Sequence, residues 1–288
     1  MKYKEVYLKD IADIVMGQSP KSEFYNKMNQ GYPFLQGVKD FGDKYPQIQM
    51  YTTSCKKIAA RDDILFSVRA PVGEVNLAKQ KIAIGRGLAS IKVKENYSRD
   101  YVYYCLKAMK RSINIMATGT VFSSINKHEL ADLKLKIPDK IYDQRKVATY
   151  FQKIDQKIEL NKQINDNLES LLTTVFEKKL NDKKFNEAKL TDIATYKNGL
   201  AMQKYRPKNN EPSLPVLKIR ELSQGYTDQS SDKCSTKIDK DVVIHTGDII
   251  FSWSGTLLIK NWSGKTAGLN QHLFKVTSNN YPEWFIYE

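Results

Sequence analysis

The 288-residue sequence contains no long hydrophobic run and few cysteines. No apolar stretch approaches the ~20 residues that a membrane-spanning helix needs. Glu5 and Asp10 interrupt the N-terminus where a signal peptide would need an apolar core. Cys55, Cys105 and Cys234 are scattered and odd in number, a pattern that indicates neither a disulfide framework nor a metal cluster. We therefore expect buried thiols in a reducing compartment and a cytoplasmic protein.

Signatures of catalysis are also scarce. His128, His245 and His272 have no second histidine or cysteine at the spacing of a zinc site. The sequence contains no Asn-Pro-Pro-aromatic run and no glycine-rich cofactor loop, so methyl transfer by this chain is not expected. We predict that this chain has no catalytic residue, binds no metal and carries no cofactor.

Positive charge, by contrast, is abundant. Lys and Arg number 46 against 32 Asp and Glu, which gives a net charge of +14. Such an excess favours a polyanionic partner, with nucleic acid as the first expectation and an anionic membrane surface as the second. The alternative interpretation of this net charge is a soluble basic protein without a polyanionic partner.

Two parts of the sequence repeat one another. The matching pairs are "LKDIADIVMG" (8–17) with "LTDIATYKNG" (190–199), "PFLQ" (33–36) with "PVLK" (215–218), "DILFS" (63–67) with "DIIFS" (248–252), "IKV" (91–93) with "FKV" (274–276), and "YVYY" (101–104) with "WFIY" (284–287). The five pairs keep one order, and their offsets stay between 182 and 185. A series of this kind indicates two copies of one domain.

The second copy is predicted to be incomplete at its C-terminus. At an offset of 183, Glu288 corresponds to Cys105, so residues 106–181 have no counterpart. Within a copy, short alternating runs such as 64–68 and 88–93 predict strands, and residues 8–15 predict a short helix. We expect an α+β fold in which each copy has a curved, mainly antiparallel sheet.

A long helix is predicted between the two copies. Neither glycine nor proline occurs between Asp139 and Asn198, and apolar residues recur there in two rows with a period of seven. A helix from Tyr142 to Leu180 would be roughly 55–60 Å long. The rows form the a/d seam of a coiled coil, which consists of Val147, Phe151, Ile154, Ile158, Asn161, Asn165, Leu168, Leu172 and Val175.

The length of this helix favours pairing with another helix, since it outreaches the domain before it. Asn161 and Asn165 lie mid-seam, where buried amides disfavour wrong registers. Packing of the whole helix onto its own domain is the alternative. The stretch "GTVFSSINKHELADLKLKIPD" (119–139) precedes the helix and contains a strand pattern at 133–137, stopped by Pro138. We place the domain borders accordingly, with a first domain at 1–138, a spacer helix at 139–184 and a second domain at 185–288.

These features resemble the specificity subunit of type I restriction–modification systems. The similarity extends over essentially the whole chain, and "GQSP" at 17–20 and "DILFS" at 63–67 support it. The residues that carry it most strongly are Gly119, Thr120, Ile125, Leu130, Leu133, Leu135, Ile137, Pro138, Gln144, Val147, Ala148, Phe151, Asp155 and Ile158.

The resemblance implies a non-catalytic subunit with two target-recognition domains. Each domain would read one half of a split sequence in double-stranded DNA, and the helix between them would fix the gap. The implied partners are two modification subunits, which methylate adenine, and a motor-nuclease subunit. S-adenosylmethionine, Mg and ATP would bind to those partners. A complete family member ends its second domain and adds a second long helix, antiparallel to the first. Because that part is missing here, we expect the helix at 142–180 to pair in trans, in a homodimer or with a second specificity fragment.

Residue chemistry supplies candidate DNA contacts on the predicted loops. Lys and Arg neutralise phosphates, Arg and Lys also recognise guanine, and Asn and Gln recognise adenine. Arg86 is the first candidate because Gly85 and Gly87 allow a close backbone approach. The full set is Gln18, Ser19, Lys21, Gln36, Lys39, Arg69, Arg86 and Thr120 in the first copy, and Lys218, Arg220, Trp253, Asn270 and Gln271 in the second. The alternative interpretation for each of them is a solvated loop residue that makes no DNA contact.

Two other functions fit the sequence. The chain could be the recognition half of a single-chain restriction enzyme, which methylase motifs in the same reading frame would reveal. It could also be a basic RNA-binding or scaffold protein that associates through its coiled coil, which competition between duplex DNA and RNA would reveal.

Overall fold

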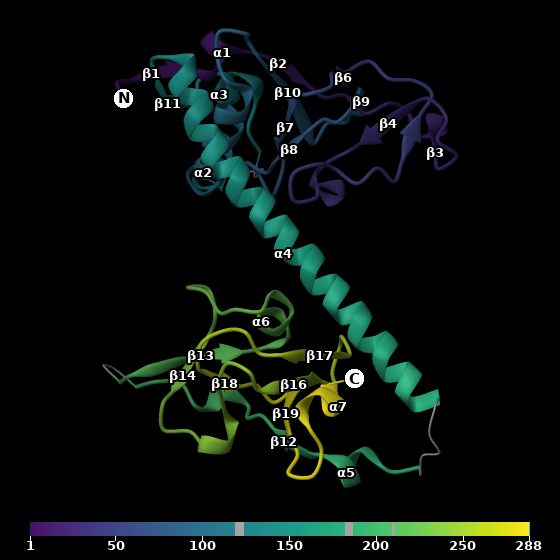
Figure 1. Ribbon diagram of the computed structural model, residues 1–288. Helices are drawn as coiled ribbons and strands as arrows, with labels where there is room; N and C mark the ends of the chain where they lie inside the picture. The colour runs from purple at the N-terminus through teal and green to yellow at the C-terminus, as the bar shows by residue number, and fades with distance from the viewer. Residues whose placement is uncertain (119–123, 182–186, 209–210, 288) are drawn as a thin grey trace. The chain divides into compact units, whose positions relative to one another are not determined.

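The structure, a computed structural model, describes residues 1–118, 124–181, 187–208 and 211–287 (Figure 1). Two compact units, residues 1–163 and 164–288, divide the chain, and the border between them falls within one helix. Gly119 and Thr120, which contribute to the family resemblance, lie outside the described residues.

A four-stranded antiparallel sheet forms the centre of the first unit. Its strands are, in order, β2 (Ala12–Met16), β10 (Leu88–Val93), β7 (Ile64–Ser67) and β8 (Val75–Leu77). Strand β7 is buried along its whole length because Ile64 and Phe66 belong to one apolar core and Leu65 belongs to another. Neighbouring residues of a strand point to opposite faces, so a continuous apolar run suits a strand that is covered on both sides.

A second sheet, of five short strands, also belongs to the first unit. Its order is β3 (Tyr25–Asn26), β5 (Tyr51–Thr52), β4 (Tyr32–Leu35), β9 (Ile82–Ile84) and β6 (Ile58–Ala59). The pairs are antiparallel except for β4 with β9, which is parallel. Two 3-10 helices, η1 (Ser22–Phe24) and η2 (Val38–Asp40), lie in the connections.

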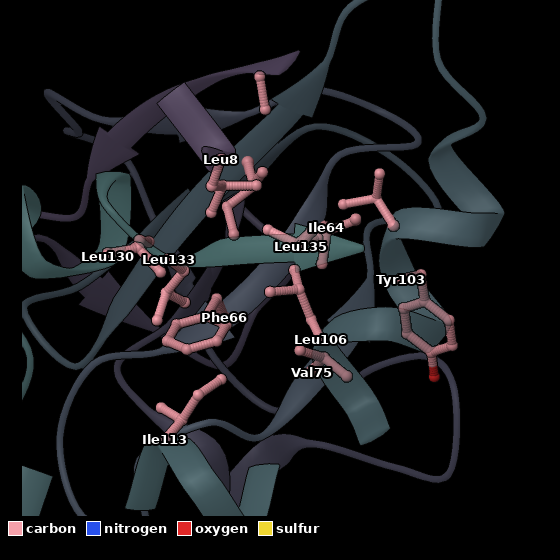
Figure 2. Packing of buried hydrophobic residues seen from close by; sticks show 14 of the residues in the cluster. Leu8, Ile64, Phe66, Val75, Tyr103, Leu106, Ile113, Leu130, Leu133 and Leu135 are labelled. Carbon is pink, nitrogen blue, oxygen red and sulfur yellow. The ribbon is translucent and has the colours of Figure 1, made fainter. Parts of the chain in front are cut away.

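Helices and a two-stranded ribbon cover the main sheet of the first unit. The ribbon pairs β1 (Tyr3–Tyr7) with β11 (Lys134–Pro138), and the helices are α1 (Leu8–Ile11), α2 (Arg99–Thr118) and α3 (Lys127–Ala131). Figure 2 shows Leu8, Phe66, Leu106, Leu133 and Leu135 converging in one core. Burying a leucine of this kind contributes roughly 2 kcal/mol. The strand predicted before the long helix is therefore present, and it pairs with the first strand of the chain.

The helix predicted at residues 8–15 is wrong beyond Ile11. Helix α1 ends there, and β2 begins at Ala12. From Ala12 onward the side chains alternate between buried or half-buried and exposed, with Asp13 and Val15 in water. This period of two belongs to a strand and replaces the helical spacing of Leu8 and Ile11.

The second unit repeats the topology of the first. Its main sheet has the order β12 (Thr195–Asn198), β19 (Leu273–Thr277), β16 (Ile249–Ser252) and β17 (Leu258–Asn261). Its smaller sheet has the order β14 (Lys233–Ser235), β13 (Ser213–Leu217), β18 (Ala267–Leu269) and β15 (Val243–Ile244). The pair β13 with β18 is parallel, as is β4 with β9. The predicted α+β fold with two copies of one domain is thus confirmed.

Short helices connect these strands. They are α5 (Leu190–Ile193), which corresponds to α1, together with α6 (Ile219–Gln224), α7 (Glu283–Tyr287), η3 (Met202–Lys204) and η4 (Lys240–Val242).

Strand pairing corrects the alignment of the two copies near their ends. Ile91 pairs with Ile64, and Val276 pairs with Ile249, so Val276 is the counterpart of Ile91 at an offset of 185. The match of "IKV" with "FKV" placed them at 183. A shift of two residues keeps the same face of a strand inward, so the hydrophobic pattern alone could not separate the two registers.

Helix α4 (Ile141–Asn181) joins the two copies as one uninterrupted helix (Figure 1). Its 41 residues span about 60 Å at 1.5 Å per residue, which confirms the predicted long helix. The first two turns pack on the first unit through Gln144, Val147 and Ala148. The domain borders placed at 138/139 and 184/185 stay a prediction. No helix in the described ranges combines the length and the hydropathy that crossing a membrane requires.

Candidate nucleic-acid interface

Three loops of the first unit meet at the ends of neighbouring strands. The Gln18 N–H donates to the Ile84 carbonyl at 2.9 Å, and the Gly87 N–H donates to the Gln36 carbonyl at 3.1 Å. The Arg86 N–H donates to Ser19 Oγ at 3.2 Å. These bonds hold the loop after β2, the loop after β4 and the loop between β9 and β10 together.

A fourth loop joins them at the end of β7. The Val68 N–H donates to the Gly87 carbonyl at 2.9 Å, and Arg69 follows directly. The structure therefore brings together four predicted loops that lie far apart in the sequence. The predicted residues gathered there are Gln18, Ser19, Gln36, Arg69 and Arg86.

The glycines at this place are required by the protein's own backbone. A Cβ on Gly87 would lie 2.6 Å from the Gln36 carbonyl oxygen, and a Cβ on Gly17 would lie 2.2 Å from the Gly85 carbonyl oxygen. Both distances are too short for any side chain. The close approach predicted from Gly85 and Gly87 thus exists, but its partner in the structure is the neighbouring loop.

The side chains of this cluster are available to solvent. Gln18, Gln36, Arg69 and Arg86 are exposed, and Ser19 is half-buried. No ion pair involves the Arg69 or Arg86 side chain among the described residues. Two free guanidinium groups can therefore bind phosphates or guanine edges without breaking an internal bond.

Three predicted residues of the first unit do not belong to this cluster. Lys21 is exposed, and its Nζ atom lies 3.7 Å from Glu23 Oε1. Lys39 is exposed on η2, beside Asp40, whose burial raises its pKa while Lys39 acts in the opposite sense. Thr120 lies outside the described residues.

The second unit has a groove of about 910 Å³ at the corresponding place. Lys218 follows β13 as Gln36 follows β4, and Asn270 and Gln271 lie between β18 and β19 as Gly85 and Arg86 lie between β9 and β10. All four predicted residues other than Trp253 line this groove, namely Lys218, Arg220, Asn270 and Gln271. The indole of Trp253 is exposed beside the groove, with its ring 5.8 Å from the ring of His272.

Two of the predicted cations in the second unit are held by acidic neighbours. Lys218 Nζ lies 2.5 Å from Asp232 Oδ2, and this bond lowers the pKa of Asp232. Arg220 Nη2 lies 2.5 Å from Glu221 Oε1, which raises the pKa of Arg220. Because the Glu221 side chain is only 2% exposed, Arg220 also neutralises a buried carboxylate. Its role is therefore partly structural.

The groove contains polar residues that the sequence did not single out. Gln203, Arg206 and Lys233 line it, and Arg206 and Lys233 are exposed. They come from the surroundings of η3 and from β14, where the two copies share no sequence pattern, so the repeat gave no signal for them. The Nδ1 atom of His272, in the same lining, is buried without a hydrogen-bond partner among the described residues.

The predicted seam of α4 divides into two parts. Val147 is half-buried against the first core, and the Phe151 ring lies 5.2 Å from the ring of Tyr104. The Tyr104 hydroxyl donates to Asp155 at 2.6 Å, and burial, together with this bond, raises the pKa of Tyr104. Farther along, Leu172 is half-buried, and the exposed seam residues are Ile154, Ile158, Asn161, Asn165, Leu168 and Val175.

Nothing in the geometry of the described residues suggests a metal centre. No group of three His, Cys, Asp or Glu side chains is placed to hold an ion in the parts of the chain that the structure describes.

Comparison with known proteins decides the family. The family model for the type I restriction modification DNA specificity domain matches residues 1–170, more than half of the chain. The chain belongs to this family. The resemblance inferred from the sequence motifs is thereby confirmed.

Two relatives from Methanocaldococcus jannaschii extend the comparison. The MjaX type I restriction enzyme specificity subunit is 43% identical over 157 residues, which cover 54% of this specificity-family chain and 37% of the relative. The MjaIX type I restriction enzyme specificity subunit is 23% identical over 309 aligned positions, which cover 95% of this chain and 70% of the relative. The chain thus spans little more than a third of the first relative's length.

Two solved structures have the same fold. One, from work on complex assembly and conformational transition of the type I restriction–modification system, is 33% identical with a TM-score of 0.52 and covers 60% of this chain and 43% of its own. The other is a type I specificity subunit from M. genitalium, with 16% identity and a TM-score of 0.52 over 97% of this chain and 73% of its own. The second likeness concerns the fold alone.

Proposed function

We propose that this chain is a non-catalytic DNA-recognition subunit of a type I restriction–modification system. One observation carries the proposal. Both copies of the repeated domain present exposed cationic side chains, with amide side chains beside them, at the same topological place, where the loops after equivalent strands meet. A polypeptide with two such surfaces is suited to a target in two halves, one half for each copy.

The chemistry of the two surfaces fits base recognition. Arginine forms two hydrogen bonds with guanine, and glutamine or asparagine forms two with adenine. The first copy offers Arg69, Arg86 and two exposed glutamines. The second offers the half-buried Gln271 and the exposed ring of Trp253, whereas Asn270 is only 7% exposed. The net charge of +14 adds affinity for the phosphate backbone that is independent of sequence.

Catalysis in this proposal is the work of partner subunits. Methyltransferase subunits and a motor-nuclease subunit would bind S-adenosylmethionine, Mg and ATP, and this chain would direct them to the DNA. A related solved structure concerns complex assembly of a type I restriction–modification system, which supports partners of this kind. Such an assembly would work in the cytoplasm, where the DNA is.

Helix α4 would act as a spacer between two recognition domains. The domains would comprise residues 1–138 and 185–288, and the spacer would comprise residues 139–184. Its exposed seam from Ile154 to Val175 would pair in trans with a second helix, from another copy or from another specificity fragment. Pairing would remove the exposed apolar stripe from water.

The test is methylation directed by this chain. We would co-express it with the methyltransferase subunit encoded beside it, purify the complex, and sequence the methylome of cells that contain both. Expected is one bipartite motif with methylated adenines, absent when this chain is omitted. Competition between duplex DNA and RNA at several salt concentrations distinguishes DNA recognition from the alternative function of RNA binding. Equal binding of both, or a methylome unchanged by this chain, would contradict the proposal.

A further inference from the structure

The connection between β3 and β4 in the first unit is an exposed loop with an apolar tip. It comprises residues 27–31, which we call the β3–β4 loop, and Lys27, Met28, Asn29 and Gln30 are all exposed. The Met28 side chain is 79% exposed. Single exposed apolar residues are common on protein surfaces. Met28 differs from such residues in the way the loop around it is held.

One side chain fixes the backbone of the β3–β4 loop. Asn26 Oδ1 accepts from the Met28 N–H and from the Gln30 N–H, each at 3.1 Å. Asn26 Nδ2 donates to the Gln30 carbonyl at 3.0 Å. Asn29 has a φ of 58°, in the left-handed region where asparagine is enriched among residues other than glycine. The loop thus has a defined conformation before any partner binds, which lowers the entropic cost of binding.

The end of the loop is anchored to the five-stranded sheet. Gly31 has a φ of 83°, and a Cβ there would lie 2.2 Å from the Thr52 carbonyl oxygen. Tyr25 and Tyr32, on either side of the loop, both pair with Thr52 of β5. The Tyr25 ring packs against the Phe34 ring with centroids 4.8 Å apart. The loop therefore presents Met28 from a base that packs closely and requires glycine at one position.

The β3–β4 loop and one loop of the candidate nucleic-acid interface lie at the two ends of β4 (Figure 1). The chain from Tyr32 to Gln36 spans about 13 Å at about 3.3 Å per residue. This length corresponds to about four base pairs of duplex DNA. From Phe24 to Lys39 the sequence has two lysines and no acidic residue. A polyanion bound at Gln36 can therefore reach the β3–β4 loop without meeting a negative side chain from this segment.

We propose that the β3–β4 loop contacts base edges in the major groove beside the target of the first unit, with the Met28 side chain against the 5-methyl group of a thymine. This inference rests on the proposed function. The thymine methyl is the apolar group among the polar edges that base pairs present in the major groove, so it is the group that an apolar tip can recognise. Asn26 is a positioning residue, because it touches no base and holds the tip in place.

The experiment is a double-mutant cycle between protein and DNA. The full chain binds a duplex that carries the methylated motif, and fluorescence anisotropy measures the affinity while each thymine is replaced in turn by uracil, which lacks only the 5-methyl group. We expect one thymine whose replacement weakens binding about fourfold. Met28→Ala should weaken binding at least as much. The uracil replacement should have no further effect in that variant, because both changes remove the same contact.

Two other variants separate the contact from the fold. Asn26→Ala keeps Met28 but releases the loop, so the preference for thymine over uracil should fall and the amides of Met28 and Gln30 should exchange faster. Leu160→Ala is the matched control, since this leucine is 55% exposed on α4 and outside the loop. It should leave the uracil effect unchanged. Thermal unfolding of each variant establishes that the first unit remains folded.

Three results would overturn the inference. Uracil may be as good as thymine at every position, or the replacement may weaken binding equally in the native chain and in Met28→Ala. In the third case, Met28→Ala binds the duplex normally but no longer co-purifies with the methyltransferase subunit, which would assign Met28 to a protein interface. None of these results contradicts the proposed function, which fails separately if the methylome is unchanged by this chain.

Discussion

Arg69 and Arg86 have exposed guanidinium groups on adjoining loops, and neither has an ion-pair partner among the described residues. Lys218 and Arg220 in the second copy, by contrast, are bound to Asp232 and Glu221. An unpaired arginine loses only water when it binds a base, whereas a paired one must first give up its carboxylate. The residues of the first copy are therefore the better candidates for guanine recognition.

Arg86→Ala should weaken binding to the cognate duplex by about 1–3 kcal/mol and relax the sequence preference at one position. The matched control is Arg61→Ala, an exposed arginine beside Asp62 that is outside the loop cluster. Fluorescence anisotropy at fixed salt, with the cognate duplex and with guanines replaced one at a time, measures both effects. Equal losses for Arg61→Ala and Arg86→Ala, with no change in preference, would place Arg86 among the phosphate contacts or outside the interface.

The half-buried thiol of Cys105 gives the stability of the first unit a dependence on pH. Burial raises the pKa of Cys105 from 9.0 to about 11, with a smaller opposing effect of the hydrogen bond to Tyr101. Between these values the unfolded chain loses the thiol proton while the folded chain keeps it. The contribution of this group is thus intact below pH 9 and is lost as the pH rises through 11.

The free energy of unfolding should therefore fall by about 2 kcal/mol more in the native chain than in Cys105→Val over that range. Urea titrations at pH 8, 9, 10 and about 11 measure the difference. Tyr103, whose pKa burial raises to about 12, contributes to both proteins and cancels in the comparison. Parallel curves for the two proteins would mean that Cys105 ionises as easily in the folded state as in the unfolded state.

At the level of elements, the beginning of α4 is fixed by one buried amide. Gln144 is 1% exposed, its Oε1 accepts from the Ser98 N–H at 2.9 Å, and its Nε2 donates to the Pro138 carbonyl at 2.8 Å. The side chain thus connects the start of the spacer helix to the turn before α2 and to the end of β11. These two hydrogen bonds are the structural role of Gln144 at the start of the helix.

Gln144→Ala leaves two buried backbone groups without partners and should cost about 2 kcal/mol of stability. Gln156→Ala, at an exposed position of the same helix, should change stability by less than about 0.5 kcal/mol. Urea unfolding of both variants against the native chain measures the two costs. If the two glutamines prove equivalent, the hydrogen bonds of Gln144 do not anchor the helix.

The elements that could be predicted from the sequence are those with a local pattern. The repeat is visible because residues such as Ile64 and Ile249 are buried in both copies and keep their type. The parallel pairing of β4 with β9 has no such signal, because its partners lie about fifty residues apart and pair only after the chain has folded. Arg206 and Lys233 could not be predicted for a related reason. Their part of the sequence has no hydrophobic periodicity, and the two residues come together only in the folded groove.

At the scale of the molecule, the proposed function makes the length of helix α4 the quantity that sets the gap of a bipartite target. Helix α4 has neither glycine nor proline, so it contains no ordinary hinge residue. Each inserted residue adds about 1.5 Å and turns the following part by about 100°. Four residues add about 6 Å and return the helix to within about 40° of its phase, while one base pair rises about 3.4 Å.

A four-residue helical insertion after Gln163 should therefore lengthen the gap in the methylated motif by about one or two base pairs and leave both half-sites unchanged. Methylome sequencing of cells that carry the variant reads the gap and the half-sites together. The matched control, Glu159→Ala with Glu169→Ala, removes two exposed charges without changing the length of the helix and should keep the native gap. If α4 sets the gap, a longer α4 must change it. An unchanged gap in the insertion variant would therefore show that another part of the assembly sets the spacing of the half-sites.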